Sequence, residues 1–224
     1  KYKSVMSDYP TLNQIQKARE RLGSLITETP AHLWSDPPLQ EQVGKDTEVF
    51  IKLELLQVTG TFKPRGALNV MLNLEPEKLK QGVTAVSAGN HAIAVAYAAK
   101  TLSTSARVVM PKYANPLRMR RARDLGAKIC LADNPHDAFD QVKKIEQKEG
   151  KIFIHPFEGP RTLEGTGTCG LEFAQQVPAL DAMILPIGGG GLCGGFAAAL
   201  KQTWPDIRIY GVEPEGADSM SRSF

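Results

Sequence analysis

The amino-acid sequence predicts an α/β fold in which parallel sheets are covered by helices on both faces. Along most of the chain, short apolar stretches alternate with segments whose apolar residues recur at helical spacing. Such alternation is typical of βαβ units, whose strands are parallel and buried. Two apolar stretches lead directly into loops of small residues that begin a helix, and ligands of such folds bind at the carboxyl ends of the strands.

The first third of the chain is the least regular part. Residues 11–22 show helical periodicity after a Pro-Thr start. Residues 31–46 are rich in proline, glycine and charge and are predicted to form a loop, whereas residues 49–53 are predicted to form a short strand. A helix is expected to begin at Pro64 and to end near Asn73.

The remainder of the chain alternates regularly between predicted strands and predicted helices. Strands are expected at residues 83–86, 106–110, 128–132, 151–155, 182–187 and 207–212. Helices are expected at residues 91–100, 115–125, 135–149, 161–176 and 191–203. Each of these helices follows one strand and precedes the next, which supports the parallel sheets.

Composition excludes several classes of protein. The 224 residues are 42% hydrophobic and 23% charged, and the net charge of +3 comes from basic residues spread along the chain, so a nucleic-acid partner is not expected. Three cysteines without a CxxC pair indicate a reducing, cytoplasmic setting. The sequence shows no apolar run of membrane-spanning length and no secretion signal. The first five residues are expected to be foreign to a native chain that starts at Met6.

Lys63 is the first candidate for a catalytic residue. Pro64 fixes its own φ and disfavours a helical conformation at Lys63, so the ammonium is expected beside the start of a helix. The partial positive charge of the helix start, and burial near Phe62, would both lower the lysine pKa and give a nucleophilic amine. The alternative is a surface lysine whose stem packs and whose ammonium stays in water.

Four consecutive glycines form a candidate phosphate site. Gly188, Gly189, Gly190 and Gly191 follow an apolar strand and precede a helix, so their N–H groups can converge on one anion. The alternative is a tight turn, with later glycines allowing close helix packing. The loop lacks the Gly-Lys-Ser/Thr ending of a nucleotide P-loop and the GxGxxG spacing of a dinucleotide site.

A second loop contains Ser87, Ala88, Gly89, Asn90 and His91 before another helix. Its N–H groups can bind a carboxylate, and the Asn90 amide can hydrogen-bond a phenolic or carbonyl oxygen. The alternative makes Ser87 a helix cap and Asn90 a turn residue. His91 on an otherwise apolar helix is more typical of a packed core residue than of a catalytic base.

These motifs together resemble those of the fold-type II pyridoxal-phosphate enzymes, and more narrowly those of the threonine/serine dehydratase and serine racemase family. The matching stretches are residues 61–67, 87–92, 188–192 and 211–215, and the resemblance covers nearly everything after Tyr9.

The resemblance implies a tryptophan synthase β-like fold with two three-layer parallel-sheet domains. Residues 1–78 and 159–224 would form an incomplete large domain that binds pyridoxal 5'-phosphate, and residues 79–158 a small α/β domain inserted in it. Family members continue well beyond the equivalent of Phe224, so the chain is expected to lack a C-terminal part of a longer enzyme.

The resemblance also implies roles for individual residues. Lys63 would carry pyridoxal phosphate as a Schiff base and later remove the α-proton of the substrate. Phe62 would lie against the cofactor ring, and Asn90 would bind its 3-hydroxyl. Gly188, Gly189, Gly190, Gly191 and Leu192 would bind the cofactor phosphate. Ser87, Ala88, Gly89, Asn90 and His91 would surround the substrate carboxylate.

The reaction implied by the resemblance is loss of water and ammonia from a β-hydroxy amino acid. Racemases of the family have a hydroxyl acid/base at the position of Ala88, and alanine cannot deliver a proton. The family therefore implies a threonine/serine ammonia-lyase, or a relative acting on hydroxyaspartate or phenylserine. An amino acid racemase with side elimination and a catalytically silent binding protein are the alternatives.

The resemblance also implies a substrate, an oligomeric state and the lack of a metal site, and the distribution of charge indicates the surroundings of one helix. The substrate would be a small amino acid, and the protein would form a homodimer or a higher homo-oligomer. No metal site is assigned, because Ser219 stands where metal-binding members have a second carboxylate after Glu213. Four arginines of one predicted helix favour a solvated face or a subunit contact over an anion site. They are Arg118, Arg120, Arg121 and Arg123.

Overall fold

The computed structural model of the chain describes residues 9–223, and the prediction about the first five residues lies outside that range. The helices are α1 (Leu12–Leu22), α2 (Pro37–Val43), α3 (Lys63–Leu72), α4 (Pro76–Lys80), α5 (Asn90–Thr101), α6 (Pro116–Asp124), α7 (Pro135–Glu149), α8 (Pro160–Gln176) and α9 (Gly191–Thr203). The strands are β1 (Ala31–Trp34), β2 (Val49–Lys52), β3 (Val83–Val86), β4 (Ala106–Pro111), β5 (Lys128–Ala132), β6 (Ile152–Phe153), β7 (Ala182–Pro186) and β8 (Arg208–Val212).

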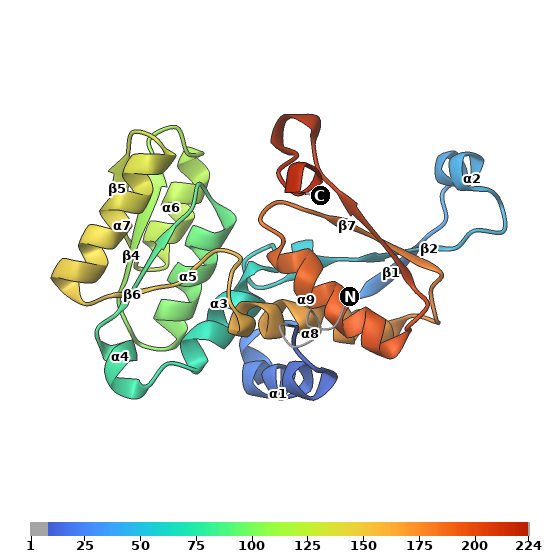
Figure 1. Ribbon diagram of the computed structural model, residues 1–224, viewed down its shortest axis with the longest axis horizontal. Coiled ribbons are helices and arrows are strands. Elements are labelled where there is room, and N and C mark those ends of the chain that lie inside the picture. Colours follow the sequence, from blue (N-terminus) through green and yellow to red (C-terminus); the bar gives the residue numbers. More distant parts are fainter. Residues whose placement is uncertain (1–8, 224) are drawn as a thin grey trace.

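The predicted α/β fold with parallel sheets is confirmed. Strands β3 to β6 form a parallel sheet in the order β5-β4-β3-β6. Neighbouring residues of β4 enter different core clusters, since Val108 packs with α5 and Val109 packs with α7. Helices therefore cover both faces of this sheet, which forms the left half of the molecule in Figure 1.

The predicted element boundaries agree closely where local end signals are strong. The bounds of β3, β5, α7 and α9 are the predicted ones. At α7, the Asn134 side chain accepts a hydrogen bond from the Asp137 N–H, and Gly150 ends the helix with a left-handed backbone (φ 67°). These are the residue types that begin and end helices.

The prediction that residues 31–46 form a loop is wrong. Strand β1 pairs antiparallel with β2, and α2 follows it, beginning at Pro37 after the Asp36 carboxylate accepts the Leu39 N–H. The proline and glycine that indicated a loop stand at the ends of these short elements. A composition average over the segment therefore concealed a four-residue strand and a capped helix.

A second parallel pair, β7 and β8, packs against α8 and α9 on one face only. Leu185 of β7 is buried in the core cluster with Phe173 and Phe196. On the opposite face, Ile184 is 68% exposed and Tyr210 is 50% exposed. Among residues 9–223, no helix covers this face, so this sheet differs from the predicted arrangement with helices on both sides.

Helix α3 lies at the centre of the molecule, between the two parallel sheets (Figure 1). One core cluster joins Leu22 of α1 and Leu68 of α3 to Val95 of α5. It crosses the expected domain boundary at residue 78, and the division into two domains stays a prediction. In the part of the chain that the structure describes, no helix is long and apolar enough to cross a membrane.

Helices α3 and α8 approach so closely that a side chain would not fit between them. A Cβ atom on Gly165 of α8 would lie 2.8 Å from the Cα of Gly66 and closer still to the carbonyl oxygen of Arg65. Because those atoms belong to the backbone, they cannot move aside without displacing α3. This contact fixes the first turn of α3, and Lys63 with it.

We predict that Gly165→Ala destabilises the protein by about 2–3 kcal/mol, the usual cost of overpacking. Denaturant unfolding measures the change. Gly216→Ala is the control, because a Cβ there meets nothing within 4 Å, and its effect should stay within about 0.5 kcal/mol. Equal stabilities for the two variants would contradict the close packing.

Candidate functional site

The site forms where the strand order of the parallel sheet reverses. Strands β3, β4 and β5 succeed one another in one direction, whereas β6 returns to the other side of β3. The loop of residues 87–89 follows β3, and residues 154–159 connect β6 to α8; we call the second segment the β6–α8 connector. Such a reversal opens a crevice at the carboxyl ends of the strands, where ligands of α/β folds bind.

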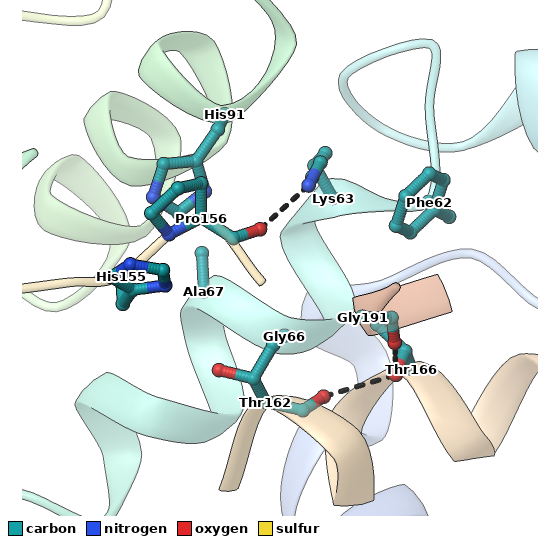
Figure 2. Close-up of a pocket in the computed structure, with 10 residues that line it drawn as sticks. All are labelled: Phe62, Lys63, Gly66, Ala67, His91, His155, Pro156, Thr162, Thr166 and Gly191. Carbon is teal, nitrogen blue, oxygen red and sulfur yellow. Dashed lines mark hydrogen bonds between the residues drawn. The ribbon is translucent and has the colours of Figure 1, made fainter. Parts of the chain in front are cut away.

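Lys63 is the first residue of α3, one residue earlier than the predicted helix start. Pro64 stands at the second helical position, where its missing N–H costs nothing. The Lys63 ammonium donates a hydrogen bond of 2.6 Å to the carbonyl oxygen of Pro156 in the connector. Figure 2 shows this bond, with His91 and His155 on the other side of Pro156.

Burial lowers the pKa of Lys63 to about 8. The Phe62 ring lies 5.1 Å from Nζ, a contact that favours the charged amine, but the loss of hydration outweighs it. The predicted direction of the shift is confirmed. An appreciable fraction of this amine is neutral near pH 7 to 8 and therefore nucleophilic.

Lys63 lines a small cavity together with residues of four other segments. The cavity of about 10 Å³ has room for about one water molecule, so a larger ligand would lie outside it. Of the other predicted site residues, Phe62, His91 and Gly191 also line it. The predicted residues that do not line it are Ser87, Ala88, Gly89, Asn90, Gly188, Gly189, Gly190 and Leu192. Figure 2 shows the lining residues Gly66, Ala67, Thr162 and Thr166 on α3 and α8.

Packing and backbone conformation explain three of the four consecutive glycines. A Cβ on Gly189 or Gly191 would collide with Phe157, and Gly190 has a positive φ of 82°. Gly188 has neither constraint, since a Cβ there would meet nothing within 4 Å. Within residues 9–223, the N–H groups of Gly188, Gly189 and Gly190 donate no hydrogen bond. The loop is therefore a tight turn, as the alternative proposed, and it also presents free donors to an exposed space.

None of the predicted site residues lies in the β6–α8 connector. Its Pro156 carbonyl accepts from Lys63, and its Phe157 ring lies against Gly189. The Nδ1 atom of His155 accepts the Glu158 N–H at 2.9 Å, and burial lowers the His155 pKa. The connector thus joins the lysine to the glycine loop. Its place directly after a strand was the signal available in the sequence.

The loop after β3 has features of both sequence interpretations. The Ser87 hydroxyl accepts a hydrogen bond from the Gly89 N–H at 3.0 Å, as expected if Ser87 serves the turn before the helix and not a ligand. Asn90 is the first residue of α5, and its side-chain amide has no hydrogen bond within the described residues. The first N–H groups of α5 have no acceptor within the helix. These N–H groups lie next to Ala88, which is exposed to solvent.

His91 is a buried, neutral residue, as its apolar helix predicted. Its Nε2 atom lies 2.8 Å from the carbonyl oxygen of Ile154, so Nε2 carries the hydrogen and donates. Burial lowers the pKa of His91 to about 3, and the charge of Lys63 acts in the same direction. His91 therefore fixes α5 to the connector and supplies no imidazolium near neutral pH.

Two of the four clustered arginines reach the site. The Arg118 guanidinium lies so close to Gly89 that a Cβ there would be 2.6 Å from Nη1. Arg121 donates a hydrogen bond to the Thr59 carbonyl oxygen, in the segment before Lys63. The prediction of a solvated face therefore does not cover all of α6, because this helix also contacts the loop after β3 and the segment before Lys63.

The Glu213 carboxylate accepts backbone hydrogen bonds from Met220 and Ser221, both at 2.9 Å, and these bonds lower its pKa. The nearby Asp218 pairs with Arg222. These contacts give Glu213 a local capping function at the end of β8.

Comparison with known proteins identifies relatives. The family described as pyridoxal-phosphate dependent enzyme matches residues 24–224. A phenylserine dehydratase from Ralstonia pickettii is 49% identical over 96% of this chain and 65% of its own length. An L-threonine ammonia-lyase from Thermotoga maritima is 39% identical over 95% of this chain and 52% of its own length. The solved structure of maize serine racemase superposes with a TM-score of 0.89 at 36% identity, over 95% of this chain and 64% of that one. The chain thus spans less than two thirds of the length of these relatives.

We predict that the Lys63 amine titrates near pH 8 in the ligand-free protein. The rate of pH-dependent amine labelling, followed by peptide mass spectrometry, should reach half its maximum there, because only the neutral amine reacts. A Lys63→Arg variant identifies the labelled peptide. A half-maximum near 10.5, the value of an ordinary lysine, would contradict the burial of the amine.

We predict that His91 makes folding pH-dependent. Its pKa rises from about 3 in the folded protein to about 6.5 on unfolding, so the unfolded state binds more protons between these values. Stability is therefore complete above about pH 6.5 and falls as the pH decreases towards 3, by up to about 1.4 kcal/mol per pH unit.

Urea unfolding between pH 7 and 4 checks this expectation. His91→Asn should flatten the pH dependence, whereas His136→Asn, at a histidine with a 90% exposed side chain, should leave it unchanged. Parallel curves for the two variants would exclude His91 as the source.

Proposed function

Because the chain belongs to the pyridoxal-phosphate dependent enzyme family, we propose that it is part of an ammonia-lyase that acts on β-hydroxy amino acids. The substrates would be L-threonine, L-serine or phenylserine. A dehydratase is the common element of the two curated relatives described above, one named for phenylserine and one for threonine. Assembly as a homodimer or larger oligomer, and location in the cytoplasm, remain predictions.

The residues of the site fit pyridoxal phosphate. Gly188 leaves open space beside free N–H donors at the start of α9, which suits a phosphate. The Lys63 amine has the lowered pKa that reaction with an aldehyde requires. The Asn90 amide is free to bind the 3-hydroxyl, and Phe62 stands next to the lysine. We assign the cofactor to these residues and to Leu192.

The cofactor, when bound, accepts the electrons released when the α-proton leaves. The chain contributes the base and the orientation. The neutral Lys63 Nζ takes the α-proton, and the N–H groups at the start of α5 bind the substrate carboxylate through residues 87–91. The β-hydroxyl then departs with a proton as water. Hydrolysis of the released unsaturated amine then consumes one water, so the net products from each amino acid are one 2-oxo acid and one ammonia.

The absence of an acid at position 88 is the observation that carries the choice of reaction. Racemisation needs a proton donor on the face of the substrate opposite Lys63. In racemases that this chain resembles, the donor stands at the position of Ala88, which has no such proton, and the buried His91 is neutral at physiological pH. Deprotonation by Lys63 alone therefore leads to elimination. Racemisation remains the second candidate because of the likeness to maize serine racemase, and a silent binding protein the third.

We predict formation of equal amounts of 2-oxo acid and ammonia from at least one of L-threonine, L-serine and phenylserine. Lys63→Ala should lower the rate by about 10²–10⁴-fold, the usual contribution of a general base, and should abolish cofactor labelling at position 63 after borohydride reduction. Lys78→Ala, at an exposed lysine of α4, is the control and should retain both.

Three outcomes would reject parts of this proposal. Formation of the D-isomer without 2-oxo acid would replace the lyase by a racemase. Cofactor that stays covalently bound in Lys63→Ala would remove Lys63 from its role. Neither product and no bound cofactor would favour the silent binding protein.

A further inference from the structure

Five charged side chains gather beneath the first turn of α3, outside the site described above. Arg65, Glu54 and Glu172 form its centre, and Lys52 and Arg19 each pair with Glu172 at about 3 Å. The Arg65 side chain is 0% exposed and that of Glu172 is 2% exposed. Buried charges are costly unless they are fully paired, so the geometry of this cluster is tightly determined.

The Arg65 guanidinium uses all of its N–H donors. Nε and Nη2 each donate to one oxygen of Glu54 at 2.8 Å. Nη1 and Nη2 donate to the two oxygens of Glu172 at 2.9 and 2.7 Å, and the second hydrogen of Nη1 reaches Thr168 at 3.1 Å. Two bidentate pairs fix both the position and the plane of the guanidinium.

Burial alone would raise the pKa of Glu54, but the hydrogen bonds and charge of Arg65 lower it below its ordinary value. Glu54 also accepts a hydrogen bond of 2.6 Å from the Thr29 hydroxyl. The Glu54 carboxylate is therefore ionised at neutral pH and has fixed partners on two sides.

The pair between Glu54 and Arg65 closes the chain segment that carries Lys63. Glu54 begins a short 3-10 helix (Glu54–Leu56), and Arg65 lies only two residues after Lys63. The segment turns at Gly60, where φ is 77°, and Arg121 binds the Thr59 carbonyl oxygen. Lys63 thus lies near one end of a loop whose ends are joined by two parallel hydrogen bonds.

We propose that Arg65 is a positioning residue, which acts through its ion pair with Glu54 to hold the Lys63 amine in its buried place opposite Pro156. The proposal rests on the proposed function for its catalytic consequence, but not for the position of the amine. A purely structural role would instead be limited to joining α3 to α8 through Glu172 and Thr168.

Other ionisable groups do not account for the environment of Lys63. His91 on α5 and His155 in the connector are the titratable groups whose charge is coupled to it, and the pKa values of both are lowered. Both are therefore neutral near pH 8. A change in the titration of Lys63 on altering Glu54 then reports a change in the position or hydration of the amine.

The test compares Glu54→Gln with Glu164→Gln. Glu164 is also a buried carboxylate between α8 and α3, but its side-chain partners, Arg161 and Asn69, lie outside the segment of residues 54–65. Amine labelling of the ligand-free protein should show the Lys63 pKa rising from about 8 towards 10.5 in Glu54→Gln, because water reaches the loosened amine. Glu164→Gln should leave it near 8. Arg65→Lys, which keeps the charge but loses the planar fork, should behave as Glu54→Gln and replaces it if that variant does not fold.

Kinetics of the cofactor-loaded protein give the second readout. Glu54→Gln should lower kcat by about ten- to a hundredfold with a smaller change in KM, since a displaced base slows proton transfer more than binding. A Lys63 pKa that stays near 8 with unchanged kcat, in folded variants of reduced stability, would leave Arg65 a structural role only. The labelling needs no cofactor, so it decides the position of the amine even if the lyase activity is not found.

Discussion

The contact between α3 and α8 is the constraint on which the site depends. Gly66 and Gly165 allow the two backbones to touch, and the Arg65 guanidinium joins them through Glu172 and Thr168. Helices can approach this closely only where the residues at the contact have no side chain and any charge buried there is fully paired. Because α3 begins at Lys63, the packing that fixes the helix also fixes the catalytic candidate.

The start of α3, the start of α5 and the β6–α8 connector meet at Lys63 because of the order of the strands. The reversal of strand order between β3 and β6 places the loop after β3 beside the β6–α8 connector. His91, in the helix that follows the loop, hydrogen-bonds to the Ile154 carbonyl oxygen of the connector. Lys63 hydrogen-bonds to the Pro156 carbonyl oxygen of the same connector. The sheet therefore contributes position, while the hydrogen-bonding groups come from helix starts and loop carbonyls.

Features that depend on local sequence were predicted well. Lys63, Asn90 and Gly191 all stand at the first residue of a helix, within one residue of the expectation. Proline, asparagine and glycine determine such ends through backbone geometry and capping, which a short stretch of sequence contains. The parallel sheet was likewise predicted from a local pattern, the regular alternation of apolar stretches with helical segments.

Features that depend on distant residues were not predicted. Arg65 and Glu172 are 107 residues apart, and nothing near either residue indicates the pairing. Phe157 meets Gly189 only because the connector crosses the start of α9. The strand β1 was missed because its four residues gain their structure from pairing with β2. Tertiary contacts of this kind outweigh local composition.

The glycine loop shows how structural and functional requirements combine at one position. Phe157 and a positive φ require glycine at three of the four positions, so those glycines would be needed without any ligand. Gly188 is different, because a side chain there would meet only open space. The packing of the structure therefore does not require glycine at this position, which lies beside the free N–H groups at the start of α9. The turn therefore explains the shape of the loop and three of its glycines, and the proposed phosphate ligand would account for the fourth.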